Sequence, residues 1–111
     1  MILREFDTPT PVSDPVTRKL TDADLRQAAH TAVALDKLVE KYNLTGLAYY
    51  YEGLEDGKHR EVSSTFIVGN SILNAQGVPM CGEFDIKTCI AMLIMDRLGI
   101  GGSFAEFHPF D

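Results

Sequence analysis

Two glutamates, Glu83 and Glu106, are the residues of this chain whose type and spacing best suit chemistry. They stand at the two ends of one apolar segment that is predicted to be a helix. Two carboxylates that converge on one point can hold a hard divalent cation, and the same pair can move a proton between adjacent carbon atoms. Spacing alone favours a simpler interpretation, in which Glu83 only caps the helix and Glu106 is only a charge on an edge strand.

The elements around these glutamates must bring them together, because the predicted helix at residues 84–98 would hold its two ends about 21 Å apart. An acidic residue, Asp85 or Glu83, is expected at its N-terminal end, where the helix dipole favours negative charge. The helix is followed by a glycine-rich segment, residues 99–102. Glycine tolerates the backbone conformations of a tight turn, so we expect the chain to fold back along the helix there.

A short strand is expected at residues 103–107. Side chains alternate between the two faces of a strand, so Glu106 would share a face with Phe104 and His108. Flanking aromatic side chains would exclude water from the carboxylate. A partly desolvated carboxylate needs a cation or has a raised pKa, and either suits catalysis. His108 is a weaker candidate for a metal ligand.

The first helix is predicted to begin after Thr21, with Asp24 as the second member of a capping box, and to stop near Asn43. Apolar residues recur within it at spacings of three and four, which predicts one buried face. Residues 1–20, which precede this helix, contain three prolines and are predicted to be an extended arm or linker. Residues 21–111 are then an α/β partial domain that carries both glutamates.

The middle of the chain is predicted to contain a strand and a helix. Residues 46–51 are typical of a short buried strand, and residues 53–60 of a charged loop. Residues 65–76 predict a helix, although the β-branched residues at 62–68 leave a strand as the alternative. The order of helix, strand, helix, helix and strand predicts the α/β class, with an open layered sheet and flanking helices.

The composition excludes several classes of partner. The net charge is −6 and the pI is about 4.9, which argues against nucleic acid, because binding there depends on clustered Lys and Arg. No apolar run reaches the roughly 18 residues of a membrane span, and the first residues are too polar for a secretory signal. We therefore expect a cytoplasmic location. Cys81 and Cys89 form no zinc-finger pattern and are expected to be two small buried thiols.

Two motifs on either side of the third helix carry a family resemblance. They are GEFDIKT at residues 82–88 and GGSFAE at residues 101–106, and the helix between them is rich in Ala, Met and Leu. Together they resemble the metal-site region of the L-arabinose isomerase family, within the L-fucose isomerase-like sugar isomerases. The resemblance covers about residues 21–111 and implies part of a larger Rossmann-like sugar-isomerase domain.

The resemblance implies isomerisation of an aldose to a ketose with a divalent ion, typically Mn²⁺. Glu83 and Glu106 would bind the metal and transfer a proton between C1 and C2 of a small sugar through an enediol. Two histidine ligands normally follow further along the chain, and the family also has an N-terminal domain. The metal site of these 111 residues is therefore expected to be incomplete, and the isolated chain inactive.

Two further expectations concern ligands and partners. The aromatic face of Tyr51, near the end of the predicted strand, is the best candidate for contact with the sugar, while at least one of its two neighbouring tyrosines must point into the core. A sheet edge left open should promote self-association, so a homo-oligomer is expected. The alternative function is a non-catalytic α/β module for assembly or ligand binding that retains the isomerase fold.

Overall fold

The computed structural model describes residues 21–50 and 57–105 of the chain. The described elements, in chain order, are α1 (Asp22–Tyr42), β1 (Leu47–Ala48), α2 (Gly57–Ser64), α3 (Phe66–Ala75), β2 (Met80–Cys81) and α4 (Ile86–Arg97). The arm expected at residues 1–20 lies outside the described residues. Within the described residues no helix has the length and apolar character that a membrane span requires.

The expected fold class, an open layered α/β sheet within a Rossmann-like domain, is wrong for the described residues. They are mostly helical, and their single sheet has two parallel strands that pair Leu47 with Met80 and Ala48 with Cys81. Each strand contributes only two residues to the ladder. The strand expected at residues 103–107 does not form over its described part, 103–105, which lies along α4 instead of joining the sheet.

Helix α1 begins and ends where its sequence predicts. The Thr21 hydroxyl accepts a hydrogen bond from the Asp24 amide at 3.2 Å, and the Asp24 carboxylate accepts one from the Thr21 amide at 2.8 Å. These two bonds form the predicted capping box and satisfy amides that an open helix end leaves unpaired. Asn43 ends the helix in the left-handed conformation, with φ of 49°.

Helix α2 begins within a predicted loop, whereas helix α3 confirms a predicted helix. Residues 57–60 belong to α2 and not to a loop, while α3 forms within the predicted range 65–76. The alternative of a strand at residues 62–68 is wrong. Thr65 separates the two helices, and its hydroxyl donates to the carbonyl of Val62 at 2.7 Å. After α3 the chain turns at Gly77, whose φ is 79°.

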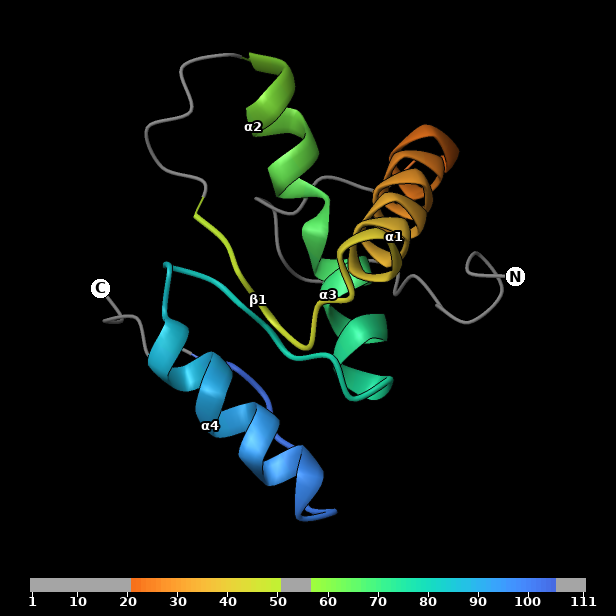
Figure 1. Ribbon diagram of the computed structural model, residues 1–111. Helices are drawn as coiled ribbons and strands as arrows, with labels where there is room; N and C mark the ends of the chain where they lie inside the picture. The colour runs from red at the N-terminus through yellow and green to blue at the C-terminus, as the bar shows by residue number, and fades with distance from the viewer. Residues whose placement is uncertain (1–20, 51–56, 106–111) are drawn as a thin grey trace, which may run out of the picture.

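The two strands lie between α4 on one side and α1 with α3 on the other (Figure 1). Successive side chains of β2 point to opposite faces of the sheet, so the strand supplies one residue to each of two hydrophobic clusters, one on either face. Met80 packs with Leu35 and Leu73 beneath α1 and α3. Cys81 packs with Cys89 and Met92 beneath α4.

The chain after α4 folds back along that helix, as the glycine-rich sequence predicts. Gly99 and Gly101 have φ of 75° and 73°, conformations that suit glycine. Gly102 then passes so close to α4 that an added Cβ would lie 3.4 Å from Cγ of Met92. Phe104 reaches the core cluster of Cys81, which places it near the N-terminal end of the helix that the chain has just left.

Candidate functional site

Glu83 lies in the turn between β2 and α4, at the carboxyl end of the parallel strands. Its backbone and that of Phe84 are both left-handed, each with φ of 53°. Such a conformation costs a residue other than glycine about 1–3 kcal/mol, so two in succession must be held by their surroundings. The Phe84 amide donates to the carbonyl of Tyr49 at 3.0 Å, and the Asp85 amide to that of Gly82 at 3.0 Å.

Asp85, and not Glu83, caps helix α4. One carboxylate oxygen of Asp85 accepts from the Thr88 amide at 2.9 Å, and the other accepts from the Thr88 hydroxyl at 2.6 Å. These hydrogen bonds, the side-chain one above all, lower the pKa of Asp85. The interpretation of Glu83 as only a helix cap is therefore wrong. Its half-buried carboxylate forms no hydrogen bond or ion pair with the described residues.

Gly82 and Phe104 bring the two predicted motifs into contact. A Cβ added to Gly82 would lie 3.3 Å from Cε1 of Phe104 and 3.8 Å from the hydroxyl of Tyr49. The residue before Glu83 therefore touches a residue only two positions before Glu106 in the sequence. Glu106 lies outside the described residues, and so do Tyr51 and His108.

The tyrosines near the site divide between the core and the surface. Tyr49 packs its ring edge-on against Phe66, with centroids 5.1 Å apart, which confirms that one of the consecutive tyrosines points inward. Tyr50 faces outward against Phe84, with centroids 5.7 Å apart. Sequence reasoning missed this exposed aromatic pair beside Glu83, although Phe84 belongs to the motif itself.

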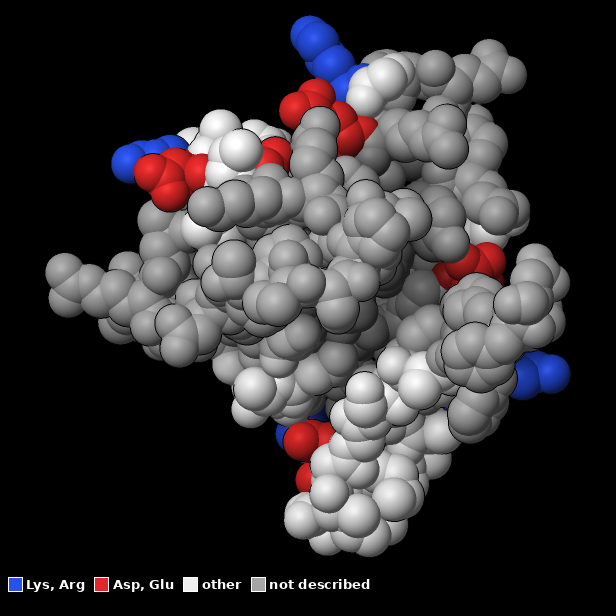
Figure 2. Space-filling model, turned by 180° about the vertical axis from the view of Figure 1, so that it is seen from behind, with Lys and Arg blue, Asp and Glu red and all other residues white. Residues whose placement is uncertain are grey.

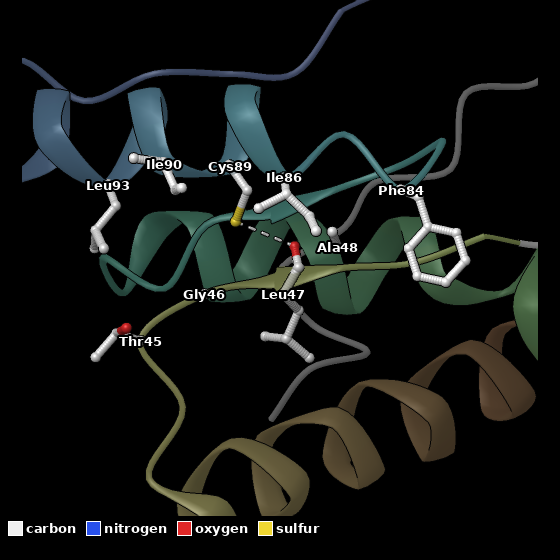
Figure 3. Close-up of a pocket in the computed structure, with 9 residues that line it drawn as sticks. All are labelled: Thr45, Gly46, Leu47, Ala48, Phe84, Ile86, Cys89, Ile90 and Leu93. Carbon is white, nitrogen blue, oxygen red and sulfur yellow. Dashed lines mark hydrogen bonds between the residues drawn. The ribbon is translucent and has the colours of Figure 1, made fainter.

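A hollow of about 320 Å³ opens between β1 and α4 (Figure 3). It is lined by Thr45, Gly46, Leu47, Ala48, Phe84, Ile86, Cys89, Ile90 and Leu93. None of these side chains carries a charge, so the hollow suits an apolar group and offers no carboxylate for a metal ion. Phe84 forms its border towards Glu83.

The described residues alone do not make a complete site for a hard metal ion. They contain no group of three His, Cys, Asp or Glu side chains placed to hold one. A carboxylate such as Glu83 is the type of donor that a hard divalent ion prefers, but one carboxylate is too few. Asp85 is close in sequence, yet both of its oxygens are used by Thr88.

The two cysteines are free and buried, as expected. Burial, and then the nearby Cys89, raise the pKa of the Cys81 thiol from an ordinary 9.0 to about 11. Cys89 donates to the carbonyl of Leu47 at 3.3 Å, the hydrogen bond drawn in Figure 3. The Cys81 thiol is therefore not placed to act as a nucleophile at neutral pH, because the thiolate is the reactive form.

Comparison of the sequence with protein-family models and with curated proteins, and of the fold with solved structures, finds no match. The chemistry of Glu83 and its neighbours is therefore the basis for inferring a function.

Proposed function

We propose that this chain is a piece of a metal-dependent aldose–ketose sugar isomerase similar to L-arabinose isomerase, and that Glu83 and Glu106 are its metal-binding and acid–base residues. The observation that carries the proposal is the contact between Gly82 and Phe104. It joins the two motifs that the resemblance assigns to one site.

This contact supports a shared site. Helix α4 has twelve residues, which would separate the motifs by about 18 Å if the chain continued straight on. The turn at Gly99 and Gly101 instead returns the chain along α4 to the start of the helix. Phe104 therefore lies against Gly82 at the carboxyl end of β2, the end at which parallel strands commonly present their functional groups.

The turn that holds Glu83 supports a functional role. Two adjacent left-handed residues other than glycine cost stability, and such strain is concentrated at binding and catalytic sites. The Glu83 carboxylate is not used for capping, since Asp85 performs that task. The hydrogen bond from Phe84 to Tyr49 fixes the turn against β1 and so fixes the direction of Glu83.

The proposed chemistry is the transfer of a proton between C1 and C2 of the sugar. A carboxylate beside the sugar removes the proton from C2 and returns it to C1, while the hydroxyl proton moves between the two oxygens, through an enediol. A bound divalent ion, Mn²⁺ in our proposal, would polarise the sugar oxygens. In our proposal Glu83 and Glu106 both orient the ion and transfer the proton, and Tyr51 contacts the sugar ring.

The second candidate function is a non-catalytic module for assembly or ligand binding. The surface of α4 and of the chain that follows it favours this alternative, because it is largely uncharged (Figure 2). Four apolar residues, each four positions from the next, lie more than half exposed on α4 and directly after it: Ile86, Ile90, Ile94 and Leu98. Exposed apolar surface of this kind often marks an interaction site.

Calorimetric titration with Mn²⁺ tests the first function. We expect Glu83→Gln and Glu106→Gln each to lower the affinity by about 10–100-fold or more. Glu61→Gln, in the exposed part of α2, is the matched control and should bind as the unchanged chain does. If the 111 residues alone bind no Mn²⁺, the same variants are compared in a protein extended by the histidine-bearing segment. Equal binding by all variants there would show that the site assignment is wrong.

The expected homo-oligomer is a separate prediction. Light scattering over a range of protein concentrations should show an average mass that rises above 12.3 kDa, the mass of one chain. The reason is the short open sheet and the exposed apolar surface of α4. A constant mass of one chain at high concentration would contradict it.

A further inference from the structure

Three sulfur atoms meet in the core beneath α4, apart from the carboxylate site. Sγ of Cys81 lies 3.3 Å from Sδ of Met92. Cys89 belongs to the same buried cluster, which Phe104 closes on one side. No described hydrogen bond or charge pair at Glu83 involves these atoms, and the function proposed above makes no use of them.

The fold explains why the sulfurs converge. Cys81 is the residue of β2 that points towards α4. Cys89 and Met92 are three positions apart on α4 and so project from the same face of the helix. The cluster therefore joins two elements that the rest of the structure already fixes, and the sulfurs of Cys81 and Met92 are in contact before any ligand arrives.

We propose that Cys81, Cys89 and Met92 form a binding site for one thiophilic metal ion, with Cu⁺ as the ion that the donors suit best. Thiolate and thioether sulfurs are soft ligands that select Cu⁺, whereas carboxylates and water select Mg²⁺, Ca²⁺ and Mn²⁺. Binding is a ligand exchange without electron transfer. Both thiols lose their protons to solvent, two Cu–thiolate bonds and one Cu–thioether bond form, and copper remains Cu⁺.

The surroundings of the sulfurs favour a soft ion over a hard one. The three sulfurs pack with the ring of Phe104, and the Asp85 carboxylate, which is near enough to act on Cys81, is held by Thr88 through both of its oxygens. The carboxylate site at Glu83 and the sulfur site thus differ in the class of metal that each accepts.

The apolar hollow provides a path to the site. Cys81 is fully buried, and Cys89 and Met92 are nearly so. Cys89, however, lines the hollow between β1 and α4, and Figure 3 shows its sulfur directed towards β1. A Cu⁺ ion delivered by a small chelator can therefore meet Cys89 first and pass to Cys81 and Met92 afterwards. A proposed metal site needs such an entry path as well as its ligands.

The test is an anaerobic titration of the reduced chain with Cu⁺ in competition with bicinchoninate. We expect one Cu⁺ per chain, bound by thiolates that belong to the same molecule. Cys81→Ser and Cys89→Ser should each lower the Cu⁺ affinity by about 100-fold or more. Mutation of a residue that only supports a metal ligand already lowers metal affinity by about 10–100-fold. These two positions hold all the cysteines of the chain.

Met92→Leu is the decisive variant, because it removes the third sulfur and nearly conserves volume. We expect at least about a tenfold loss of Cu⁺ affinity, as for other partners of a metal site. Met95→Leu, at an outer position of the same helix, is the matched control and should bind as the unchanged chain does. Circular dichroism without copper identifies any variant that fails to fold, and the comparison of the two leucine variants then decides alone.

Other outcomes would overturn the proposal. Equal affinity in Met92→Leu and Met95→Leu would exclude the three-sulfur site. Half an ion per chain would indicate copper bridged between the thiolates of two molecules. Absence of binding by the fully reduced chain would leave the cluster as core packing. Glu83→Gln should bind Cu⁺ normally, so failure of the isomerase proposal and failure of this one give different results.

Discussion

The left-handed backbone of Glu83, and of Phe84 after it, lowers the stability of the fold. A side chain in this conformation crowds the backbone, and glycine would avoid the crowding. Glu83 is half-buried, and its side chain forms no hydrogen bond to the other described residues that would offset this cost. The sequence predicts the importance of Glu83 through its motif, but not its backbone conformation, because glutamate has no preference for positive φ.

Replacement of this residue by glycine should separate stability from function. We predict that Glu83→Gly raises the free energy of unfolding by about 1 kcal/mol, because it relieves the left-handed strain. The same variant should lose Mn²⁺ affinity. Urea denaturation provides the measurement. Gly99→Ala, at φ of 75° with open space around it, should lower the stability by a similar amount. A destabilised Glu83→Gly would instead assign the side chain a structural role.

The Cys81 thiol should make stability depend on alkaline pH. Its pKa is raised to about 11 in the folded chain from an ordinary 9.0. Between these values the unfolded chain loses the proton and the folded chain keeps it, so stability falls as pH rises from about 9 to 11. Below pH 9 both states hold the proton, and this group adds no dependence. Urea denaturation across this range should show a shallower fall for Cys81→Ala than for the unchanged chain.

At the scale of elements, the sequence predicts the features that depend on neighbouring residues, such as helix ends, but not the pairing of strands. The capping box of Thr21 and Asp24 and the stop at Asn43 depend on neighbouring residues alone, so the sequence predicts α1 correctly. The helix at residues 57–64 was missed because a charged segment with a glycine is typical of a loop. The sequence predicted a larger sheet than the structure has, since the length of a strand depends on partners that are distant in sequence.

The contact between α1 and α3 is an element-scale feature that a single methyl group should disrupt. A Cβ at Gly69 would lie 2.6 Å from Cδ1 of Leu35 and 3.0 Å from Cα of Ala32. We predict that Gly69→Ala destabilises the fold by about 1–3 kcal/mol, despite the better helix propensity of alanine. Gly57→Ala, with nothing within 4 Å of the new atom, is the control in thermal denaturation. Equal melting temperatures for the two variants would show that α1 and α3 pack less closely.

At the scale of the molecule, the candidate site depends on how the segments before and after helix α4 come into contact. The sequence predicts the fold-back from its glycines, and the structure confirms it. It could not predict which side chain would close the loop, because that contact joins Phe104 to residues 15 and 22 positions earlier in the chain, Cys89 and Gly82. Phe104 therefore connects the returning chain to β2, to α4 and to the turn of Glu83.

Truncation of Phe104 should reveal this connection. Phe104 is partly buried, so we predict that Phe104→Ala costs about 1–3 kcal/mol, less than the 3–5 kcal/mol typical of a fully buried phenylalanine. It should also lower Mn²⁺ affinity by about tenfold, because the segment before Glu106 loses its anchor on Gly82. Phe84→Ala removes a phenylalanine that is 63% exposed and should cost far less stability. If Phe104→Ala were destabilised but bound Mn²⁺ unchanged, the contact would hold the fold together without positioning the two glutamates.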